Sequence, residues 1–446
     1  MERIGAYARM DPWRRIVLWT IGAYIVLNAG FEMVRIPPVG AGVPVGELVL
    51  VCSLCIINLL ILLPRMAAEV WLLPILVWWG MSLSRSLVDT TIGGAWSFRD
   101  ASQAIESLYL VVGFWLVSEP GYVEDFFTWL RKLLTLLAFY GLLFPFAGTL
   151  QKFSPKLPGV ASTYSSSILF QVTNSPEMLL WAACWLLIDR SSRHRIRTTL
   201  WACLLVAFSV AFSQERTIYV EVLIVGVVLL LVRRKVATKW AMVLLFGVVI
   251  IGIVSLSGLE LKGRLGKTIS LDFIAQHFEA ISGSAQTEGL EGAAGGVGQR
   301  IEWWNHIYSQ LRSSPADAIF GLGYGVPLTN FHGPNGVVRE PHNSYISVVA
   351  RLGLSGFIVW TMMQVSLYAS WWRSYRLCKR LGWKREQNNL LLLFVFCVLI
   401  AVIAIGEDGF EKPFNAIPYY LFMGVVLRYG RHLRLWASSQ EAAPLR

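Results

Sequence analysis

Charged side chains are scarce in this chain of 446 residues, because only 15% of them are Asp, Glu, Lys or Arg. Soluble proteins contain about 25% charged residues, so this shortage excludes an ordinary water-soluble enzyme. Hydrophobic residues make up 55% of the sequence, and apolar runs of about 18 residues or more recur along it. Each run can cross a bilayer as a helix, which satisfies its own backbone polar groups. We therefore predict an all-α integral membrane protein.

Cysteines are few as well, and all six fall in the apolar runs or in one basic connection. The chain therefore shows neither a disulfide framework nor a thiolate metal site. Cys52 and Cys55 have CxxC spacing, but an apolar helix surrounds them. Two small residues that help helices to pack are the simpler interpretation of that pair.

The apolar runs predict about twelve membrane-spanning helices and one long polar loop. The second and third spans would form a hairpin that turns at Pro64-Arg65-Met66. The chain then divides into residues 1–257 with nine spans, a loop over 258–341 that contains short helices, and residues 342–446 with three spans and a tail. The twelve spans cover roughly residues 16–34, 44–64, 68–86, 100–118, 124–147, 166–188, 198–213, 217–232, 239–257, 343–370, 388–406 and 413–430.

The net charge of +11 does not indicate a nucleic-acid partner, because the basic residues cluster in alternate short connections. The clusters lie near residues 3–15, 190–197, 233–239, 373–385 and 428–434. Such clustering marks the cytoplasmic side of a membrane protein. Both termini are then cytoplasmic, and the polar loop lies outside, in the periplasm if the cell has two membranes. The acidic connection from Ser118 to Asp125 is the exception to the pattern.

Four of the six histidines lie in the polar loop or at its edge. The most informative is His342, in the segment Pro341-His342-Asn343-Ser344, where the loop meets the tenth span. A lone histidine is most often structural. This one, however, lies at a boundary between water and membrane where a lipid headgroup would also lie, and Asn343 and Ser344 can cap the following helix. We take His342 as the candidate catalytic residue.

Three outer arginines are candidates for binding a phosphate group, because the guanidinium fork donates two parallel hydrogen bonds. Arg216 follows a short turn where the charge rule disfavours arginine, although a pair with Glu215 or contact with headgroups would also explain it. Arg300 begins an amphipathic pattern over Gln299–Leu311 that fits a helix on the membrane surface. Arg264 opens the polar loop, and contact with anionic lipid is the alternative for it.

Two other motifs favour simpler interpretations. The segment Gly321-Leu322-Gly323-Tyr324-Gly325 follows no βαβ strand, so close packing of backbone is a better explanation than a nucleotide loop. The loop's histidines are far apart and its carboxylates are not paired, so we expect no metal and no cofactor. Glu407-Asp408, in a separate outer loop, is the acidic pair for which a metal role stays open.

In their order along the chain, these segments resemble the bacterial O-antigen ligase and polymerase superfamily. The resemblance covers about a third of the chain, from about Ala211 to Gly356. It rests on Ser213-Gln214-Glu215-Arg216, Arg300-Ile301-Glu302-Trp303-Trp304, Gly321-Leu322-Gly323, His342-Asn343-Ser344 and Arg351-Leu352-Gly353-Leu354-Ser355-Gly356.

The resemblance implies a metal-independent membrane glycosyltransferase, similar to GT-C-type enzymes, at the periplasmic face of the bacterial inner membrane. Its donor would be a glycan on undecaprenyl diphosphate. Arg216, Arg300 and Arg264 would bind the diphosphate. His342 would be the general base of a direct inverting displacement, kept neutral by the nearby arginines.

Within that superfamily we favour a ligase, which passes O-antigen to lipid A–core oligosaccharide in lipopolysaccharide biosynthesis. A polymerase and a protein O-oligosaccharyltransferase are the alternatives. A transporter or flippase would need charges in mid-span, and an intramembrane metal hydrolase would need clustered His and acidic ligands; the sequence favours neither.

Overall fold

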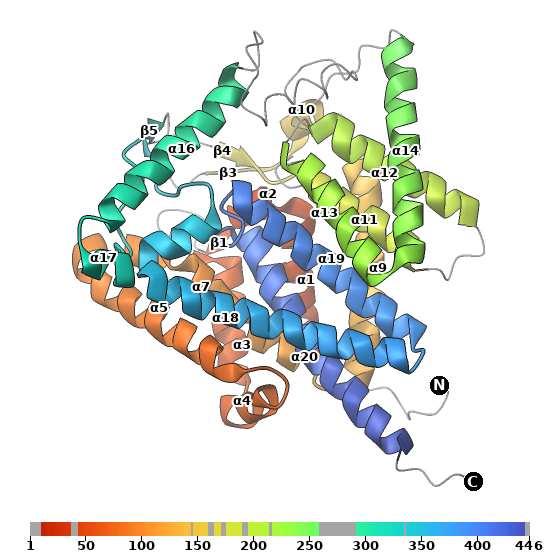
Figure 1. The fold of residues 1–446 in the computed structure, drawn as a ribbon, viewed down its shortest axis with the longest axis horizontal. Helices are drawn as coiled ribbons and strands as arrows, with labels where there is room; N and C mark the ends of the chain where they lie inside the picture. The colour runs from red at the N-terminus through yellow and green to blue at the C-terminus, as the bar shows by residue number, and fades with distance from the viewer. Residues whose placement is uncertain are drawn as a thin grey trace. The chain divides into compact units, whose positions relative to one another are not determined.

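The computed structural model describes residues 10–36, 43–143, 146–158, 165–170, 175–189, 195–213, 216–257, 291–333 and 336–441 (Figure 1). These residues form an all-α fold, as predicted, with three short strand pairs, β1–β2, β3–β4 and β5–β6. The elements are α1 (Pro12–Leu27), α2 (Ala29–Glu32), β1 (Arg35–Ile36), β2 (Val43–Pro44), α3 (Val45–Ile56), α4 (Leu59–Ala67), α5 (Leu72–Gly93), α6 (Trp96–Asp100), α7 (Ser102–Ser107), α8 (Tyr109–Leu116), α9 (Pro120–Gly141), α10 (Ala147–Leu150), a 3₁₀ helix (Gln151–Phe153), β3 (Lys156–Pro158), β4 (Ser165–Ser167), α11 (Ser175–Ile188), α12 (Arg195–Ser213), α13 (Arg216–Val232), α14 (Arg234–Leu256), α16 (Glu291–Leu311), α17 (Pro315–Phe320), β5 (His332–Gly333), β6 (Gly336–Val337), α18 (Ser344–Arg380), α19 (Lys384–Gly406) and α20 (Pro413–Glu441).

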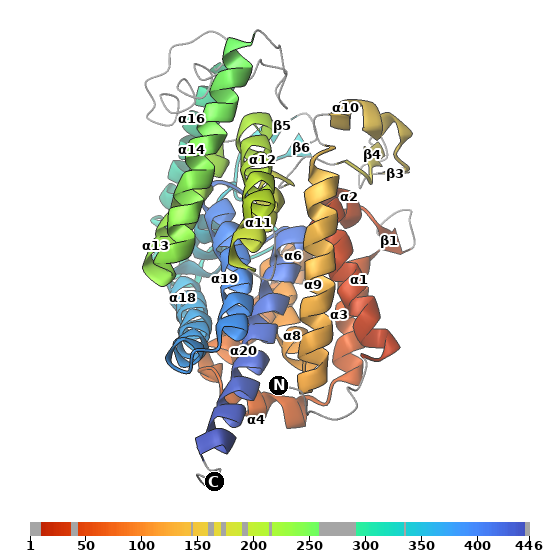
Figure 2. The ribbon, with the colours of Figure 1, turned by 90° about the vertical axis from the view of Figure 1, so that its right-hand side faces the viewer.

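The chain packs as two compact units. The first contains Met1–Gly22, Val43–Leu130 and Glu302–Arg446, and the second contains Ala23–Gly42 and Arg131–Ile301. In the second unit α12 packs on both α11 and α14, and these helices lie side by side in Figure 2. In the first unit α18, α19 and α20 pack on one another, and α5 packs on α18.

Helices α8 and α20 of the first unit are in close backbone contact. A Cβ on Gly113 would lie 2.0 Å from the carbonyl oxygen of Leu421, and one on Gly424 would lie 2.1 Å from that of Leu110. Small residues allow such contact between helices whose other faces are apolar. The contact between α8 and α20 fixes the N-terminal end of α20 and the loop before it within the first unit, which also contains α18.

Three described helices are long and apolar enough to cross a membrane: Arg234–Ile253, Ser344–Arg380 and Lys384–Gly406. The pair α3 and α4 would count as a fourth span if taken together, although the two are bent by 95°. That bend falls at Asn58, whose side chain accepts a hydrogen bond from the amide of Ile61. Pro64 lies inside α4, so the hairpin turn predicted at Pro64-Arg65-Met66 was wrong.

Helix α18 is broken at Gly353, where φ is 65° and ψ is −166°. The carbonyl of Ala350, just before the break, accepts a hydrogen bond of 2.7 Å from the amide of Leu322. A Cβ on Gly321 would lie 2.4 Å from the carbonyl carbon of Arg351. The glycine-rich segment therefore serves close backbone packing, as the sequence predicted, and the structure identifies the broken helix as its partner.

Gly353→Ala should destabilise the protein. The left-handed φ disfavours any side chain, and the new Cβ would lie 2.4 Å from the carbonyl carbon of Ile319; strain of this kind costs about 1–3 kcal/mol. Gly80→Ala is the matched control, because a Cβ on Gly80 meets nothing within 4 Å. Thermal unfolding in detergent should show a lower midpoint for the first variant only. Equal midpoints would contradict this account of the break.

Candidate active site

His342 lies at the N-terminal end of α18, and its backbone takes an unusual conformation with φ of 51°. The next residue, Asn343, caps the helix, because its side chain accepts a hydrogen bond of 3.0 Å from the amide of Ile346. The side-chain amide of Asn343 also donates to the carbonyl of Ile405, at the end of α19. The capping role predicted for Asn343 is confirmed. Non-glycine residues with positive φ are concentrated at functional sites, so this conformation supports His342 as a candidate functional residue.

Two carboxylates hold the imidazole ring of His342. Its Nδ1 lies 3.1 Å from Oε2 of Glu407 and 3.1 Å from Oδ2 of Asp408. The Asp408 side chain is only 3% exposed, whereas that of Glu407 is 45% exposed. The buried Asp408 is therefore the better-fixed partner. Because Nδ1 lies beside these two acids, Nε2 is the ring nitrogen that remains for a substrate.

The same acids control the protonation of the histidine. Burial lowers the pKa of His342, but hydrogen bonds and charges from Asp408 and Glu407 outweigh this effect and raise the pKa from 6.5 to about 9. The expectation that neighbouring arginines keep His342 neutral was therefore wrong. The groups within hydrogen-bonding distance of Nδ1 are carboxylates, and they favour the imidazolium form.

Aromatic side chains from the polar loop form one wall beside His342. The ring of Trp303 on α16 lies 5.7 Å from that of His342 and 5.6 Å from that of Phe331, measured between centroids. The indole Nε1 of Trp304 donates a hydrogen bond of 2.9 Å to the carbonyl of Pro341. These contacts fix the segment that carries the histidine.

Helix α16 includes the predicted segment Gln299–Leu311 and begins earlier, at Glu291. Its apolar face is only partly exposed, because Ile301 and Tyr308 remain accessible at its surface. Ile307 and Leu311 instead form a buried cluster within the protein, because residues of the loop and of α18 cover them. The other members of that cluster are Leu328, Ile346 and Ala350.

Carboxylates accept hydrogen bonds from two backbone amides of the glycine-rich segment. The amide of Tyr324 donates to Oδ2 of Asp89 at 2.7 Å, and that of Gly325 donates to Oδ2 of Asp100 at 2.9 Å. The amides just before them donate to backbone carbonyls of α18. A phosphate would need these amides free, so the segment cannot bind a nucleotide in this conformation.

Arg351 anchors α18 to Asp100 and to a second acid, Glu340. Its guanidinium lies 3.0 Å from Oδ2 of Asp100 and 3.1 Å from Oε1 of Glu340, and it is almost fully buried. Arg339 pairs with Asp100 as well, at 2.7 Å. Because each cation is paired with carboxylates, this network holds the loop against α18 and leaves the arginines unavailable to a substrate.

The three predicted phosphate-binding arginines are placed as follows. Arg216 is the first residue of α13, and its side chain is outside the described part of the structure. Arg300 lies on α16 and is half-buried. Arg264 falls outside the described residues. Arg216 and Arg300 belong to the second unit and His342 to the first, so convergence of the arginines with His342 stays a prediction.

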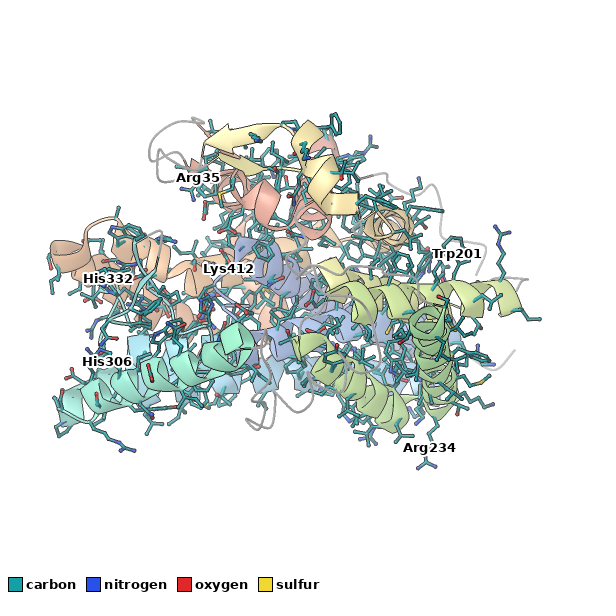
Figure 3. All side chains as sticks on the ribbon, turned by 90° about the horizontal axis from the view of Figure 1, so that it is seen from above. Arg35, Trp201, Arg234, His306, His332 and Lys412 are labelled. Atoms are coloured by element: carbon teal, nitrogen blue, oxygen red, sulfur yellow. The ribbon has the colours of Figure 1, made fainter. Side chains whose placement is uncertain are left out.

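Sequence reasoning considered Glu407 and Asp408 only as possible metal ligands and did not connect them with His342. Within the described residues, no group of three His, Cys, Asp or Glu side chains has the arrangement of a metal site. Two of the loop histidines, His306 on α16 and His332 on β5, are marked in Figure 3. The signal that could have revealed the pairing was the adjacent acid pair itself, between α19 and α20.

Part of the chain matches a known family. The family model described as O-antigen ligase matches residues 201–361. That range includes Arg216, Arg264, Arg300 and His342, together with the break in α18. No curated protein matches the chain.

Proposed function

Because residues 201–361 of this chain belong to the O-antigen ligase family, we propose that the protein is an O-antigen ligase of the bacterial inner membrane. It would transfer a glycan from undecaprenyl diphosphate to lipid A–core oligosaccharide at the periplasmic face. The observation that carries this proposal is the strained His342, held by Asp408 and Glu407 at the end of a membrane-spanning helix.

In this mechanism His342 removes the proton from the acceptor hydroxyl as that hydroxyl attacks the anomeric carbon. A general base must come within about 2.6–3.2 Å of the oxygen atom that carries the proton. In this mechanism Nε2 is the ring nitrogen that accepts the proton. Asp408 and Glu407 orient the ring and stabilise the imidazolium that forms. The single carboxylate behind the catalytic histidine of a hydrolytic triad acts in the same way.

The diphosphate leaves with its negative charge, and Arg216, Arg300 and Arg264 would neutralise it. Preorganised cations stabilise charge that develops in a transition state. Arg216 also begins α13, and the free amides at a helix N-terminus favour an anion. Direct attack by the acceptor would invert the anomeric centre and would need no metal and no covalent intermediate.

The membrane arrangement in this proposal is the predicted one. About twelve helices would cross the membrane, both termini would be cytoplasmic, and residues 258–341 would lie in the periplasm. His342 would then stand at the periplasmic end of α18, and the basic residues near Arg380 at its cytoplasmic end.

The decisive experiment supplies purified protein with carrier-linked glycan and one of three acceptors: lipid A–core oligosaccharide, a second carrier-linked glycan or a protein with free hydroxyls. Transfer to lipid A–core oligosaccharide supports a ligase. Transfer only to a second carrier-linked glycan would identify a polymerase. Transfer only to protein hydroxyls would identify an oligosaccharyltransferase. If no glycan is transferred but the carrier moves across the membrane, the protein is a flippase. The reaction should persist in excess chelator, and loss of activity that magnesium or manganese restores would contradict metal independence.

The pH dependence of transfer should reveal the carboxylate partners of His342. A general base acts in its neutral form, so kcat/KM should rise with pH as His342, with its pKa of about 9, loses its proton. Asp408→Asn removes the largest of the contributions that raise this pKa. The limb of the profile should therefore move toward 6.5, the ordinary value for histidine.

The control for this shift is Asp317→Asn, which removes a carboxylate from the first turn of α17. Its profile should match that of the unaltered protein. A limb that stays in place in Asp408→Asn would show that His342 does not titrate in the rate-limiting step.

A further inference from the structure

We infer that one face of α18, from Met362 to Arg380, binds an anionic phospholipid, with its phosphate in a basic cavity and an acyl chain in an adjoining apolar groove. The site lies at the opposite end of α18 from His342. It is therefore separate from the proposed transfer reaction.

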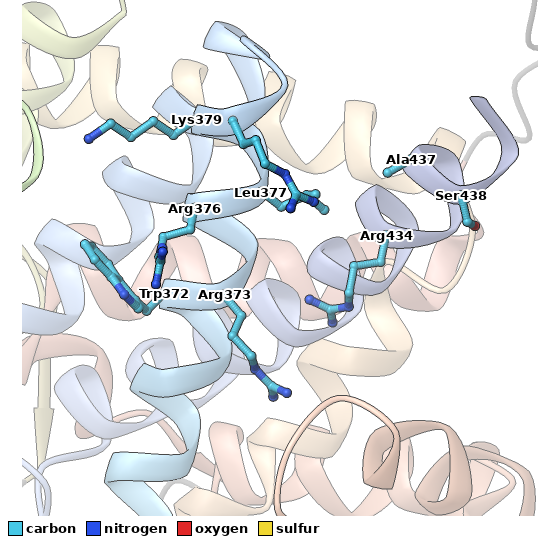
Figure 4. A pocket seen from close by; sticks show the side chains of 9 residues that line it. Trp372, Arg373, Arg376, Leu377, Lys379, Arg434, Ala437 and Ser438 are labelled. Carbon is cyan, nitrogen blue, oxygen red and sulfur yellow. The ribbon is translucent and has the colours of Figure 1, made fainter. Parts of the chain in front are cut away.

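The basic cavity has a volume of about 820 Å³ and lies between the C-terminal parts of α18 and α20 (Figure 4). Five cationic side chains line it: Arg373, Arg376, Lys379 and Arg380 from α18, and Arg434 from α20. Clustered arginines of this kind suit a phosphodiester, because each fork can donate two hydrogen bonds to it.

Protein groups neutralise only part of this charge. Arg434 pairs with Glu69, and Arg373 donates to the carbonyl of Glu69 at 2.6 Å. Among the residues that the structure describes, no carboxylate pairs with Arg376, Lys379 or Arg380. The cavity therefore keeps an excess of positive charge that an external anion can balance.

The apolar groove adjoins this cavity and shares Arg373 with it. It has a volume of about 520 Å³, and its apolar lining includes Val70, Trp71, Met362 and Val365. A free inorganic anion would gain nothing from such a surface, whereas an acyl chain would bury apolar area on it. The occupant that suits both cavities is an amphiphile with an anionic phosphate head.

The spacing along α18 fits one lipid molecule. Residues 362, 366, 369, 373, 376 and 380 recur every three or four positions and therefore share one face of the helix. The stretch spans about 27 Å, enough for a phospholipid that fills half of a bilayer about 40–45 Å thick. Trp372, 43% exposed beside the cavity, is a residue type that favours the headgroup level.

Lipid retention by the full-length protein in detergent tests this site. The probes are phosphatidylglycerol, phosphatidylcholine with the same acyl chains, and inorganic phosphate, and native mass spectrometry counts bound molecules. We expect the unaltered protein to retain phosphatidylglycerol over phosphatidylcholine. Arg376→Gln with Arg380→Gln should weaken phosphatidylglycerol binding by roughly 10- to 30-fold.

A matched control removes two cations from another helix end. Arg234 and Lys235 open α14 and are exposed, and the Arg234 side chain points away from the ribbon in Figure 3. Replacing both with glutamine should leave phosphatidylglycerol binding within about twofold, because isolated surface charges contribute little. Equal losses in the two double variants would overturn the site, since general surface charge would then explain binding.

Ala369→Phe tests the groove without altering any charge. Ala369 is exposed and lines the groove, so the larger side chain should obstruct an acyl chain and leave the fold intact. We expect weaker phosphatidylglycerol binding in this variant and unchanged binding of inorganic phosphate. If Ala369→Phe binds the lipid normally and inorganic phosphate displaces it efficiently, the cavity takes a free phosphate and the lipid proposal is wrong.

Discussion

Replacing His342 with alanine should reduce glycan transfer by about 10²–10⁴-fold, the usual cost of losing a general base. The variant should still fold and bind donor, because Asn343 caps α18 and the Trp304 indole contacts the Pro341 carbonyl without help from the imidazole. Single-turnover rates with saturating donor and acceptor separate this loss of chemistry from a loss of binding.

Two further variants make the result specific to His342. His306→Ala removes a histidine from α16, on the same loop, and should transfer at the normal rate. His342→Ala should also lose the pH dependence that Asp408 and Glu407 impose. Normal turnover by His342→Ala at saturating substrates would show that the histidine is structural, and the proposed mechanism would then fail.

The sequence was sufficient for the features that depend on local pattern. Helical hydrophobic runs, the cap at Asn343 and the close backbone packing of the glycine-rich segment all follow from spacing and residue type. Each of these features depends either on residues that are neighbours in the chain or on glycines, which lack a side chain and so allow backbone segments to approach closely.

Features that depend on folding at long range could not be predicted in the same way. His342 meets Glu407 and Asp408 because α18 leads into α19 and returns to the same end. Nothing in the spacing of about 65 residues indicates that return. The sequence analysis assigned arginines as neighbours of His342 and did not connect the pair Glu407-Asp408 with it, so the predicted protonation state was the neutral one, whereas these acids raise the pKa of His342.

Polar residues hidden among apolar ones explain another difference. The run over residues 100–118 was expected to be one span, but residues 96–116 form the short helices α6, α7 and α8. Gln103 and Glu106 in this region are buried. Hydropathy averages over a window cannot distinguish such a broken, buried segment from a lipid-facing helix.

Substitution of Arg216 or Arg300 should cause the second large loss of glycan transfer. Arg216→Ala and Arg300→Ala should each lower transfer by about 30-fold to several thousand-fold, since losing one partner of a desolvated charge pair costs roughly 2–5 kcal/mol. Each lysine variant should keep part of the activity, because lysine retains the charge and loses the bidentate fork. Arg312→Ala, just after α16 and exposed, is the matched control and should transfer normally.

The double alanine variant tests whether Arg216 and Arg300 act on the same group. Two residues that bind one diphosphate should be non-additive, so the double variant should lose less than the product of the single losses. Carrier monophosphate supplies the comparison, because it lacks one of the two phosphates that the arginines would divide between them. Donor affinity should fall in the variants for the diphosphate carrier and change far less for the monophosphate. If both carriers respond identically to every substitution, the arginines do not recognise the diphosphate, and the charge of the leaving group must be stabilised by other residues.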